Sequence, residues 1–343
     1  MRLQLQESVL PSPFIEYAEL KRLIRERGLL NKQPIYYTSK ILLTLGLLSM
    51  SIAFLVLIDN MWLHVANAAF MAFVFGQMSF IGHDCGHRQI FVSNRNNEII
   101  GFVVCFLLGL PSSWWVDKHT RHHSNPNDVA LDPDADFPFF AFTEEQARSK
   151  EGFYRLIAKY QAYLFLPLLA LEGVGLRLAS IQYLLRTKGK FPVVELLLMA
   201  SHFAIYLAVL FYLLGPWPAL LFIVVHQAAI GLYMGSVFAP NHIGMPIMNN
   251  DTRMDYVRRQ VVASRNIKGS PLFDFWCGGL NYQIEHHLFP TMPRNKLKET
   301  QQIVKEFCLA RLIPYYETGI FRAQREILQF LHQESAPLRK ANR

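Results

Sequence analysis

The sequence predicts an all-α integral membrane protein, with four transmembrane helices in two hairpins beneath a cytoplasmic helical cap. Of its 343 residues, 52% are hydrophobic and only 17% are charged, whereas an ordinary soluble domain is about 25% charged. The apolar residues gather in four long runs rather than spreading along the chain. Every Lys and Arg lies outside the two blocks that contain these runs, residues 41–87 and 191–252. Together these observations favour membrane helices over a large soluble core.

The two hairpins are predicted from four apolar runs, each long enough for one crossing. A helix rises ~1.5 Å per residue, so about 20 residues span the hydrocarbon core. Asp59-Asn60 separates the runs of the first hairpin, and Gly215-Pro216 joins those of the second. Glu195 lies near the start of the third run, where the membrane interface could solvate its carboxylate. The four runs are residues 41–58, 61–82, 193–214 and 217–239.

A shorter apolar segment, residues 99–113, is expected to be re-entrant rather than spanning. It contains two glycines before Pro111, and short segments of this kind are more often buried or re-entrant. We expect one domain overall. Its predicted parts are an N-terminal cytoplasmic or interfacial segment (1–40), hairpin 1 (41–82), a cytoplasmic cap segment (83–191), hairpin 2 (192–239) and a C-terminal cap segment (240–343).

The distribution of positive charge predicts the orientation in the membrane. A formal net charge of +8 would, by itself, also suit nucleic-acid binding. Because Lys and Arg avoid both hairpins, the positive-inside rule instead places both termini and the polar regions in the cytoplasm. We therefore expect the lipid bilayer as a partner and no nucleic acid. Amphipathic helices, lying on the membrane surface or packed as ordinary cap helices, are expected at 14–28, 153–171 and 295–312.

Seven of the 12 histidines fall in three short clusters. HDCGH at 83–87 places two histidines four residues apart, and HTRHH at 119–123 and QIEHH at 283–287 use spacings of three and four. On a helix these spacings put side chains on one face, so one segment can supply several ligands to one metal. Imidazole suits iron, zinc, copper and nickel. The predicted ligands are His83, His87, His119, His122, His123, His286 and His287.

The predicted topology brings these clusters to one site. The first begins where the second helix leaves the membrane, and the third follows two further crossings. The second cluster reaches the same face only if residues 99–113 do not span. His242, just past the fourth run, is an eighth candidate ligand, with the capping of helix-end carbonyls as the alternative. Eight histidines exceed the usual four ligands of a zinc site, so we expect two metal ions, and a di-iron site in the cap.

Polar groups beside the clusters are expected to orient the ligands. Asp84 and Glu285 are the first candidates because each lies between ligands, and Asn125 and Asp132 follow the second cluster. Asp117, Asp128 and Asp134 are further candidates, and any of these could instead be an ordinary surface group. The histidines predicted to lie beyond reach of the metals are His64, His202, His226 and His332.

The motifs resemble those of the membrane fatty acid desaturase family. The matching strings are HDCGH at 83–87, HTRHH at 119–123, NHIG at 241–244 and QIEHHLFPTMP at 283–293. The similarity runs from the first hairpin through Tyr315. The glutamine that begins the third motif resembles the front-end branch of the family and its bacterial relatives.

The resemblance implies four transmembrane helices under a cytoplasmic cap, two iron ions, and O₂ with two electrons for each double bond made. It implies that the same eight histidines are the ligands, with Gln283 as a candidate ninth. Many front-end enzymes carry a fused cytochrome b5 domain with an HPGG motif, which this sequence lacks. We therefore expect a separate electron donor of ferredoxin or cytochrome b5 type. A basic face would attract an acidic donor, and it equally suits anionic lipid headgroups.

The favoured prediction is an O₂-dependent fatty-acyl desaturase acting on an acyl-lipid, acyl-CoA or acyl-ACP substrate. Trp114 and Trp115 are expected to line an acyl tunnel or to anchor at the interface. An alternative is hydroxylation, acetylene formation or another lipid oxygenation on the same scaffold. A second alternative is a non-catalytic metal-binding membrane protein. A transporter of that kind would place polar ligands near the bilayer midplane, whereas the histidine clusters lie outside the apolar runs.

Overall fold

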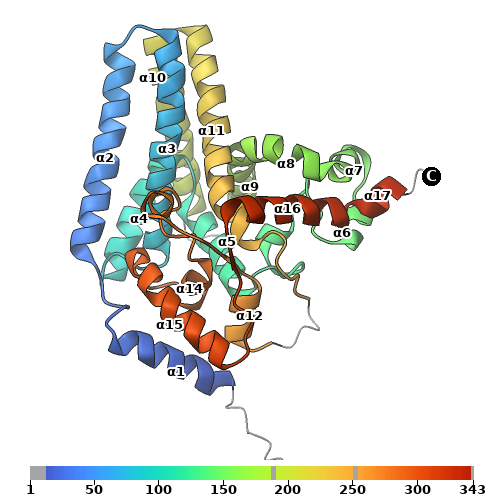
Figure 1. Ribbon diagram of the computed structural model, residues 1–343. Coiled ribbons are helices and arrows are strands. Elements are labelled where there is room, and N and C mark those ends of the chain that lie inside the picture. The colour runs from blue at the N-terminus through green and yellow to red at the C-terminus, as the bar shows by residue number, and fades with distance from the viewer. Residues whose placement is uncertain (1–12, 187–190, 250–253, 341–343) are drawn as a thin grey trace, which may run out of the picture.

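The computed structural model describes residues 13–186, 191–249 and 254–340, and helices dominate it (Figure 1). Four helices are long and apolar enough to cross a membrane, as the sequence predicted. The four are α2 (Pro34–Leu57), α3 (Met61–Gly86), α10 (Pro192–Leu214) and α11 (Pro216–His242). Polar residues extend α2, α3 and α11 beyond the apolar runs that predicted them, whereas α10 adds only Pro192.

Local sequence explains the turns between these helices. Asn60 N-caps α3, since its side-chain oxygen accepts hydrogen bonds from the backbone amides of Trp62 and Leu63. Gly215 ends α10 with φ = 74°, which a residue with a side chain rarely adopts. Pro216 then begins α11, at a helix position where proline is favoured. Two short turns therefore reverse the chain where the sequence predicted the hairpin tips.

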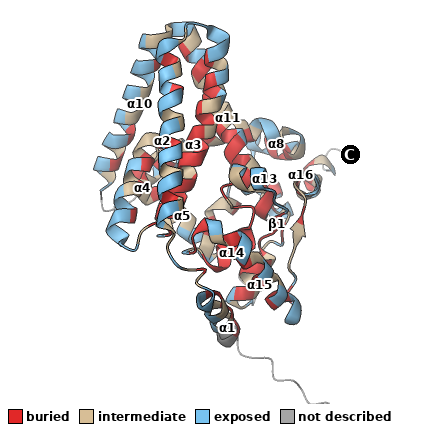
Figure 2. Cartoon of the chain, turned by 60° about the vertical axis from the view of Figure 1, so that its left-hand side comes forward, coloured by how far each residue is buried: buried red, intermediate tan, exposed pale blue. Residues whose placement is uncertain are grey.

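The four long helices are unequally buried. In α3, 67% of the most apolar stretch is buried, against 17% in α2 and in α10. Figure 2 shows the same difference, with α3 largely buried and α2 and α10 largely exposed. The exposed apolar side chains on α2 and α10 are suited to contact with lipid rather than with water. The central helices α3 and α11 are thus the ones that can position residues at the end of the bundle.

Two pairs of shorter helices are sharply bent. The first pair is α4 (Asn94–Leu108) and α5 (Ser112–Ser124), which meet at 106°. The second is α8 (Gln161–Ala170) and α9 (Glu172–Arg186), which meet at 75°. The first bend falls inside residues 99–113, the segment expected to be re-entrant. Its course through a membrane stays a prediction, because a broken span would have the same bend.

Smaller elements pack at one end and one side of the bundle (Figure 1). Ile24 of the first helix and Val261 and Ile284 of two others share one buried core. This core joins α1 (Pro13–Glu26), α12 (Tyr256–Val262), α14 (Gln283–Leu288) and α15 (Leu297–Ala310). The remaining helices are η1 (Pro133–Ala135), α6 (Glu144–Ser149), α7 (Gly152–Lys159), α13 (Pro271–Trp276), η2 (Arg294–Lys296), α16 (Ile320–Glu334) and α17 (Ala336–Lys340).

The structure has helices at all three predicted amphipathic segments, and one of these segments is divided into two helices. Helices α1 and α15 fall where the sequence placed them, whereas 153–171 divides into α7 and α8 at Tyr160. The all-α prediction holds apart from one small parallel pair of strands, β1 (Asn266–Ile267) and β2 (Glu317–Thr318). Two-residue strands give no periodic pattern in a sequence, so this pairing depends on tertiary contacts.

Candidate metal centre

Helix α3 delivers the first histidine pair. His83 lies in the last turn of this helix, and His87 is its C-cap residue. The i, i+4 spacing keeps both rings on one side, 4.7 Å apart between ring centres. A long, central and buried helix is a rigid support for these two side chains.

Three other helices bring the remaining histidines to the same place. Helix α5 carries His119, His122 and His123, as the spacing predicted. Helix α14 carries the third cluster, with Gln283 as its first residue and His286 and His287 in its last turn. His242 is the last residue of α11. The third cluster is almost fully buried, with His286 at 0% and His287 at 1% exposure.

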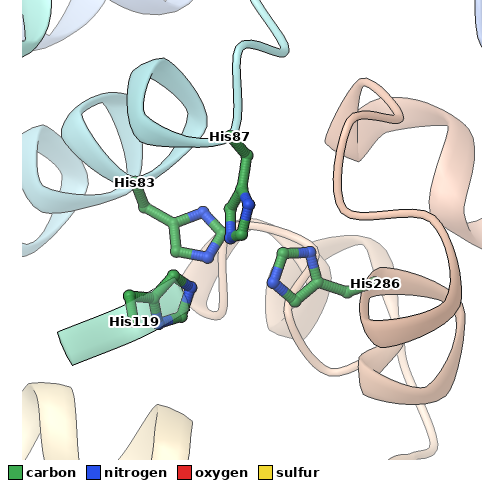
Figure 3. Close-up of side chains that lie close together, drawn as sticks. All are labelled: His83, His87, His119 and His286. Carbon is green, nitrogen blue, oxygen red and sulfur yellow. The ribbon is translucent and has the colours of Figure 1, made fainter. Parts of the chain in front are cut away.

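The histidines form two groups. In the first, ring nitrogens of His83, His87, His119 and His286 all lie within 4.8 Å of one another. Figure 3 shows these four rings, from three separate segments, pointing toward one another. A metal–nitrogen bond is about 2.1 Å, so ligands on opposite sides of an ion are ~4 Å apart. A contraction of less than about one ångström would therefore place all four on one ion.

The second group consists of His122, His242 and His287, again within 4.8 Å. His122 also faces the carboxylates of Asp132 and Asp134. His123 lies between the groups. Its ring centre is 4.5 Å from that of His87 and 4.2 Å from that of His287. All eight predicted ligands are thus brought together, while none of the four histidines expected outside belongs to either group.

Several ring nitrogens in the groups are buried without a hydrogen-bond partner. They include the Nε2 atoms of His83, His87 and His287 and both ring nitrogens of His286. A buried polar atom without a partner costs about 1–3 kcal/mol, and a cluster of them is rare in folded proteins. The donor set therefore fits metal ions, which would bind these lone pairs.

Burial keeps most of these rings neutral. It holds the pKa of His87, His119, His123, His286 and His287 well below the ordinary value, and the neighbouring imidazoles add to this. A neutral imidazole has a free lone pair, which metal binding requires. His122 differs. Burial alone would lower its pKa, but Asp132 and Asp134 outweigh burial and raise it.

Neighbouring polar groups fix the rings of several ligands. The Nδ1 of His122 is 3.0 Å from both carboxylate oxygens of Asp132, and the Nδ1 of His83 is 3.2 Å from Asp84. His242 donates from Nδ1 to the Ala263 carbonyl at 3.1 Å. Such contacts choose which ring nitrogen would face a metal ion, and in each case this nitrogen is Nε2.

The Glu285 carboxylate bonds to Asn266 and Tyr315 rather than to a histidine ring. It accepts hydrogen bonds from Asn266 Nδ2 at 2.6 Å and from the Tyr315 hydroxyl at 2.8 Å. Asn266 in turn accepts from the backbone amide of Ile284 at 2.9 Å. Burial raises the pKa of Glu285 to about 7, while the two donors oppose this. The β1 strand residue Asn266 thus connects α14 to the segment that carries Tyr315.

Gln283 lies at the second group. Its Nε2 is 3.0 Å from the Nε2 of His242, and its Oε1 accepts from Asn241 Nδ2 at 3.2 Å. The amide therefore occupies the side from which an ion would approach His242. Rotation of this amide would turn its oxygen toward that ion instead.

Sequence reasoning missed three polar residues that contact the centre. Gln260 accepts from His287 Nδ1 at 2.9 Å and donates to the His123 carbonyl. Arg294 forms a buried ion pair with Asp84 at 3.0 Å. Asn127 donates from its backbone amide to Asp132. Only Arg294 had a sequence signal, since it directly follows QIEHHLFPTMP.

The four other polar candidates near the second cluster are differently placed. Asn125 donates to the Arg121 carbonyl at the end of α5. Asp117 pairs with Arg121 and Asp128 with Arg259. Asp134 contacts both Lys118 and His122. Of these, Asp134 is the one that reaches a histidine of the two groups directly.

Trp115 closes the first group on one side. Its ring stacks on His119 with ring centres 4.7 Å apart, and Trp114 on the same helix is buried. The close fit depends on Gly86, because a Cβ there would lie 2.2 Å from Trp115 Cζ3. A side chain at position 86 would therefore displace the indole.

Gly86→Ala is expected to lower the metal content per chain and to destabilise the fold by about 1–3 kcal/mol, as overpacking does. Displacement of Trp115 would move His119 with it. Metal analysis and thermal unfolding of purified protein would measure both effects. Gly46→Ala is the matched control, because a Cβ at Gly46 meets nothing within 4 Å. Equal behaviour of the two variants would contradict the prediction.

The chain is similar in sequence to known proteins. A family model described as fatty acid desaturase matches residues 60–319. The chain is 31% identical over 341 residues to an acyl-lipid (9-3)-desaturase of Physcomitrium patens, covering 95% of this chain and 64% of that protein. It is 30% identical over 324 residues to the Delta(6)-fatty-acid desaturase fat-3 of Caenorhabditis elegans, covering 89% and 71%.

A second Caenorhabditis elegans relative, the Delta(5) fatty acid desaturase fat-4, is 28% identical over 331 residues, covering 92% of this chain and 72% of that protein. The chain spans less than two thirds of the Physcomitrium patens protein. The matched region 60–319 contains every histidine of the two groups. The predicted desaturase resemblance is therefore confirmed at the level of the family, and the chain belongs to the fatty acid desaturases.

Proposed function

We propose that this protein is an O₂-dependent fatty-acyl desaturase that holds two iron ions with its clustered histidines. The observation that supports this most is the pair of adjacent histidine groups with buried, unpaired ring nitrogens. Neither group alone uses all eight histidines, and imidazole is a suitable ligand for iron. Two ions side by side account for the number and the division of the ligands.

In this proposal His83, His87, His119 and His286 hold one iron, and His122, His242 and His287 hold the other. His123 lies against rings of both groups and would bind at their boundary. When bound, iron supplies the O₂-dependent oxidising power that removal of hydrogen from an unactivated methylene requires. Two vicinal hydrogens leave the acyl chain, and together with O₂, two electrons and two protons they form two molecules of water.

The chain's own residues keep the centre oriented and dry. Asp132, Gln260 and the Ala263 carbonyl hold ring Nδ1 atoms and so direct Nε2 inward. Trp115 covers the first group next to His119. Excluding water in this way protects a reactive centre from side reactions.

A small cavity supports an acyl substrate. It measures about 50 Å³. Its lining includes Leu108, Leu110, Ile230 and Met234, together with the charged residues Glu172 and Arg177. Ser79 also lines it and lies one helical turn before His83 on α3. Residues four apart share a helix face, so the cavity lies along the side of α3 that leads to the first group. We propose that the acyl chain enters this space, which widens when substrate binds.

The names of the relatives suggest the substrate and the position of the bond. Two are acyl-lipid (9-3)-desaturases, from Physcomitrium patens and Borago officinalis, and others act at positions 5, 6 or 8. We propose an acyl-lipid substrate and a new double bond toward the carboxyl end of the chain, beginning at carbon 5, 6 or 8. Acyl-CoA and acyl-ACP are the alternatives that the test below separates.

The membrane arrangement and the electron donor are part of the same proposal. Four apolar helices cross the bilayer, and the metal centre lies with both termini on the cytoplasmic side, where all Lys and Arg occur. Exposed arginines at this face, such as Arg88 immediately after His87, would attract an acidic donor. A separate ferredoxin or cytochrome b5 type protein would then supply the electrons.

Gas chromatography with mass spectrometry of fatty acids tests the proposal. We expect a host expressing the protein to accumulate a new unsaturated acid whose double bond begins at carbon 5, 6 or 8. The product should be absent with His119→Ala/His122→Ala and present with His332→Ala, an exposed histidine outside both groups. Separating lipid, CoA and carrier-protein fractions after a short label identifies the substrate by where the product first appears.

Three results would contradict the proposal. A hydroxylated or acetylenic product would retain the metal centre and assign a different oxidation. Purified protein that contains no iron, from cells that supply iron and an electron donor, would remove the basis for oxidative chemistry. Iron at two per chain with no new acid, in a host that offers all three carriers and a donor, would exclude desaturase activity.

A further inference from the structure

The corner between α4 and α5, residues 109–111, lies against helix α10. The chain bends by 106° here, directly before the helix that carries His119, His122 and His123. Two polar side chains of the otherwise apolar α10 touch this region. They are Glu195 and His202, seven residues apart and so on nearly the same helix face.

Glu195 binds the first turn of α5. Its carboxylate accepts a hydrogen bond from the backbone amide of Ser113 at 2.8 Å and a second one from the Ser113 hydroxyl. Helix α5 makes no side-chain cap of its own, because its N-cap residue is Pro111. Glu195 therefore supplies, from another helix, the acceptor and the negative charge that a helix N-terminus favours.

The burial of Glu195 shows that this contact is specific. Only 3% of the residue is exposed, so the interface does not solvate it as the sequence suggested. Within the described ranges, no lysine or arginine nitrogen lies within 4.0 Å of its carboxylate. A buried carboxylate without a cation needs hydrogen-bond donors, and the first turn of α5 provides them.

His202 contacts the same corner from the next turns of α10. Gly109 has φ = 66°, and a Cβ there would lie 2.5 Å from His202 Cδ2. The imidazole thus packs on the bare backbone of the corner. Together Glu195 and His202 hold α10 against both ends of the bend, at Gly109 and at Ser113.

The corner is close enough to the metal ligands to affect them. Six residues separate Ser113 from His119, or ~9 Å along the helix. Trp115 lies between them and stacks on the His119 ring. A change in the first turn of α5 would therefore move Trp115 and tilt the ligands that follow.

We propose that Glu195 is a positioning residue that fixes α5 and thereby the ligands His119, His122 and His123. This role rests on the proposed function, in which these three histidines hold iron. It explains why an acidic residue is buried in a membrane-spanning helix, where polar groups are costly and usually functional. Helix α10 would accordingly determine the geometry of a metal centre to which it contributes no ligand.

Two measurements on purified protein test this role. Hydrogen exchange of the peptide that covers residues 112–118 should be faster in Glu195→Ala than in the wild type, in metal-free protein. Iron per folded chain should fall, with affinity about tenfold weaker, as for other residues that orient metal ligands. Glu195→Gln keeps an acceptor oxygen for Ser113 and should restore both values in part.

Glu144→Gln is the matched control, since Glu144 is an exposed acidic residue in the first turn of α6. It should change neither value. Exchange and iron content in Glu195→Ala equal to those of the control would overturn the proposal. A lower melting temperature with unchanged iron per folded chain would also overturn it, because Glu195 would then only stabilise the fold. Exchange is measured without metal, so it tests the contact even where the chain proves not to bind iron.

Discussion

Replacing His286 with alanine is expected to remove about one of the two proposed irons and to abolish the proposed desaturation. His286 supplies the first group with a ring that is fully buried and has both nitrogens unpaired. Its loss leaves His83, His87 and His119 of the four rings in Figure 3, with His123 at the boundary of the group. The proposed reaction uses both ions, so desaturation should be abolished.

A comparison between the two groups makes this test sharper. His242→Ala removes a ligand from the second group and should likewise leave about one iron, held by the first group. The variant His286→Ala/His242→Ala should bind almost none. Iron per chain, measured by mass spectrometry of purified protein, gives these values, with His332→Ala as the control. Two irons retained in both single variants would show that the groups do not each hold an ion.

Replacing Arg294 with methionine is expected to destabilise the protein by about 3–5 kcal/mol, the usual cost of breaking a buried ion pair from one side. Arg294 is 4% and Asp84 0% exposed, with Nε and Oδ2 3.0 Å apart. Burial alone would lower the pKa of Arg294, but Asp84 outweighs burial and raises it. Without the guanidinium, the Asp84 carboxylate beside His83 would be left buried and unpaired.

The same ion pair connects the first and third histidine motifs, so its loss should also affect the metal. Asp84 contacts His83 on α3, and Arg294 begins η2 just after α14. A fall in melting temperature of roughly 10 °C is expected for Arg294→Met. The variant Asp84→Asn/Arg294→Met, which removes both charges, should recover most of that loss. Arg22→Met removes an exposed pair with Glu26 and serves as the control.

These shifts in melting temperature would be measured by heating each variant in detergent and determining the remaining folded fraction by size-exclusion chromatography. A shift for Arg294→Met no larger than for Arg22→Met would contradict a stabilising role of the pair. Failure of the double variant to recover stability would show that packing of Arg294 on Phe80 and Tyr36, rather than its charge, is what matters.

The sequence by itself was enough to predict which histidines lie close together in the fold. Helical spacing in 83–87, 119–123 and 283–287 was enough to place ligands on common faces, because helix periodicity is a local property. Long apolar runs and the positions of Lys and Arg likewise predicted four helices that the structure contains. Even His242, which lies outside the three clusters, was predicted from its place at the end of a run.

Only the tertiary structure decided how the ligands divide and what orients them. The assignment of His83 and His286 to one group, and of His122 and His242 to the other, depends on packing between segments far apart in the chain. Isolated polar residues such as Gln260 produce no local pattern, so their contacts could not be predicted from sequence. Glu195 shows the same limit of local information. The sequence placed it at the interface, and only the meeting of α10 with α5 buried it against a helix N-terminus, because hydrogen-bond partners 82 residues apart are set by the fold.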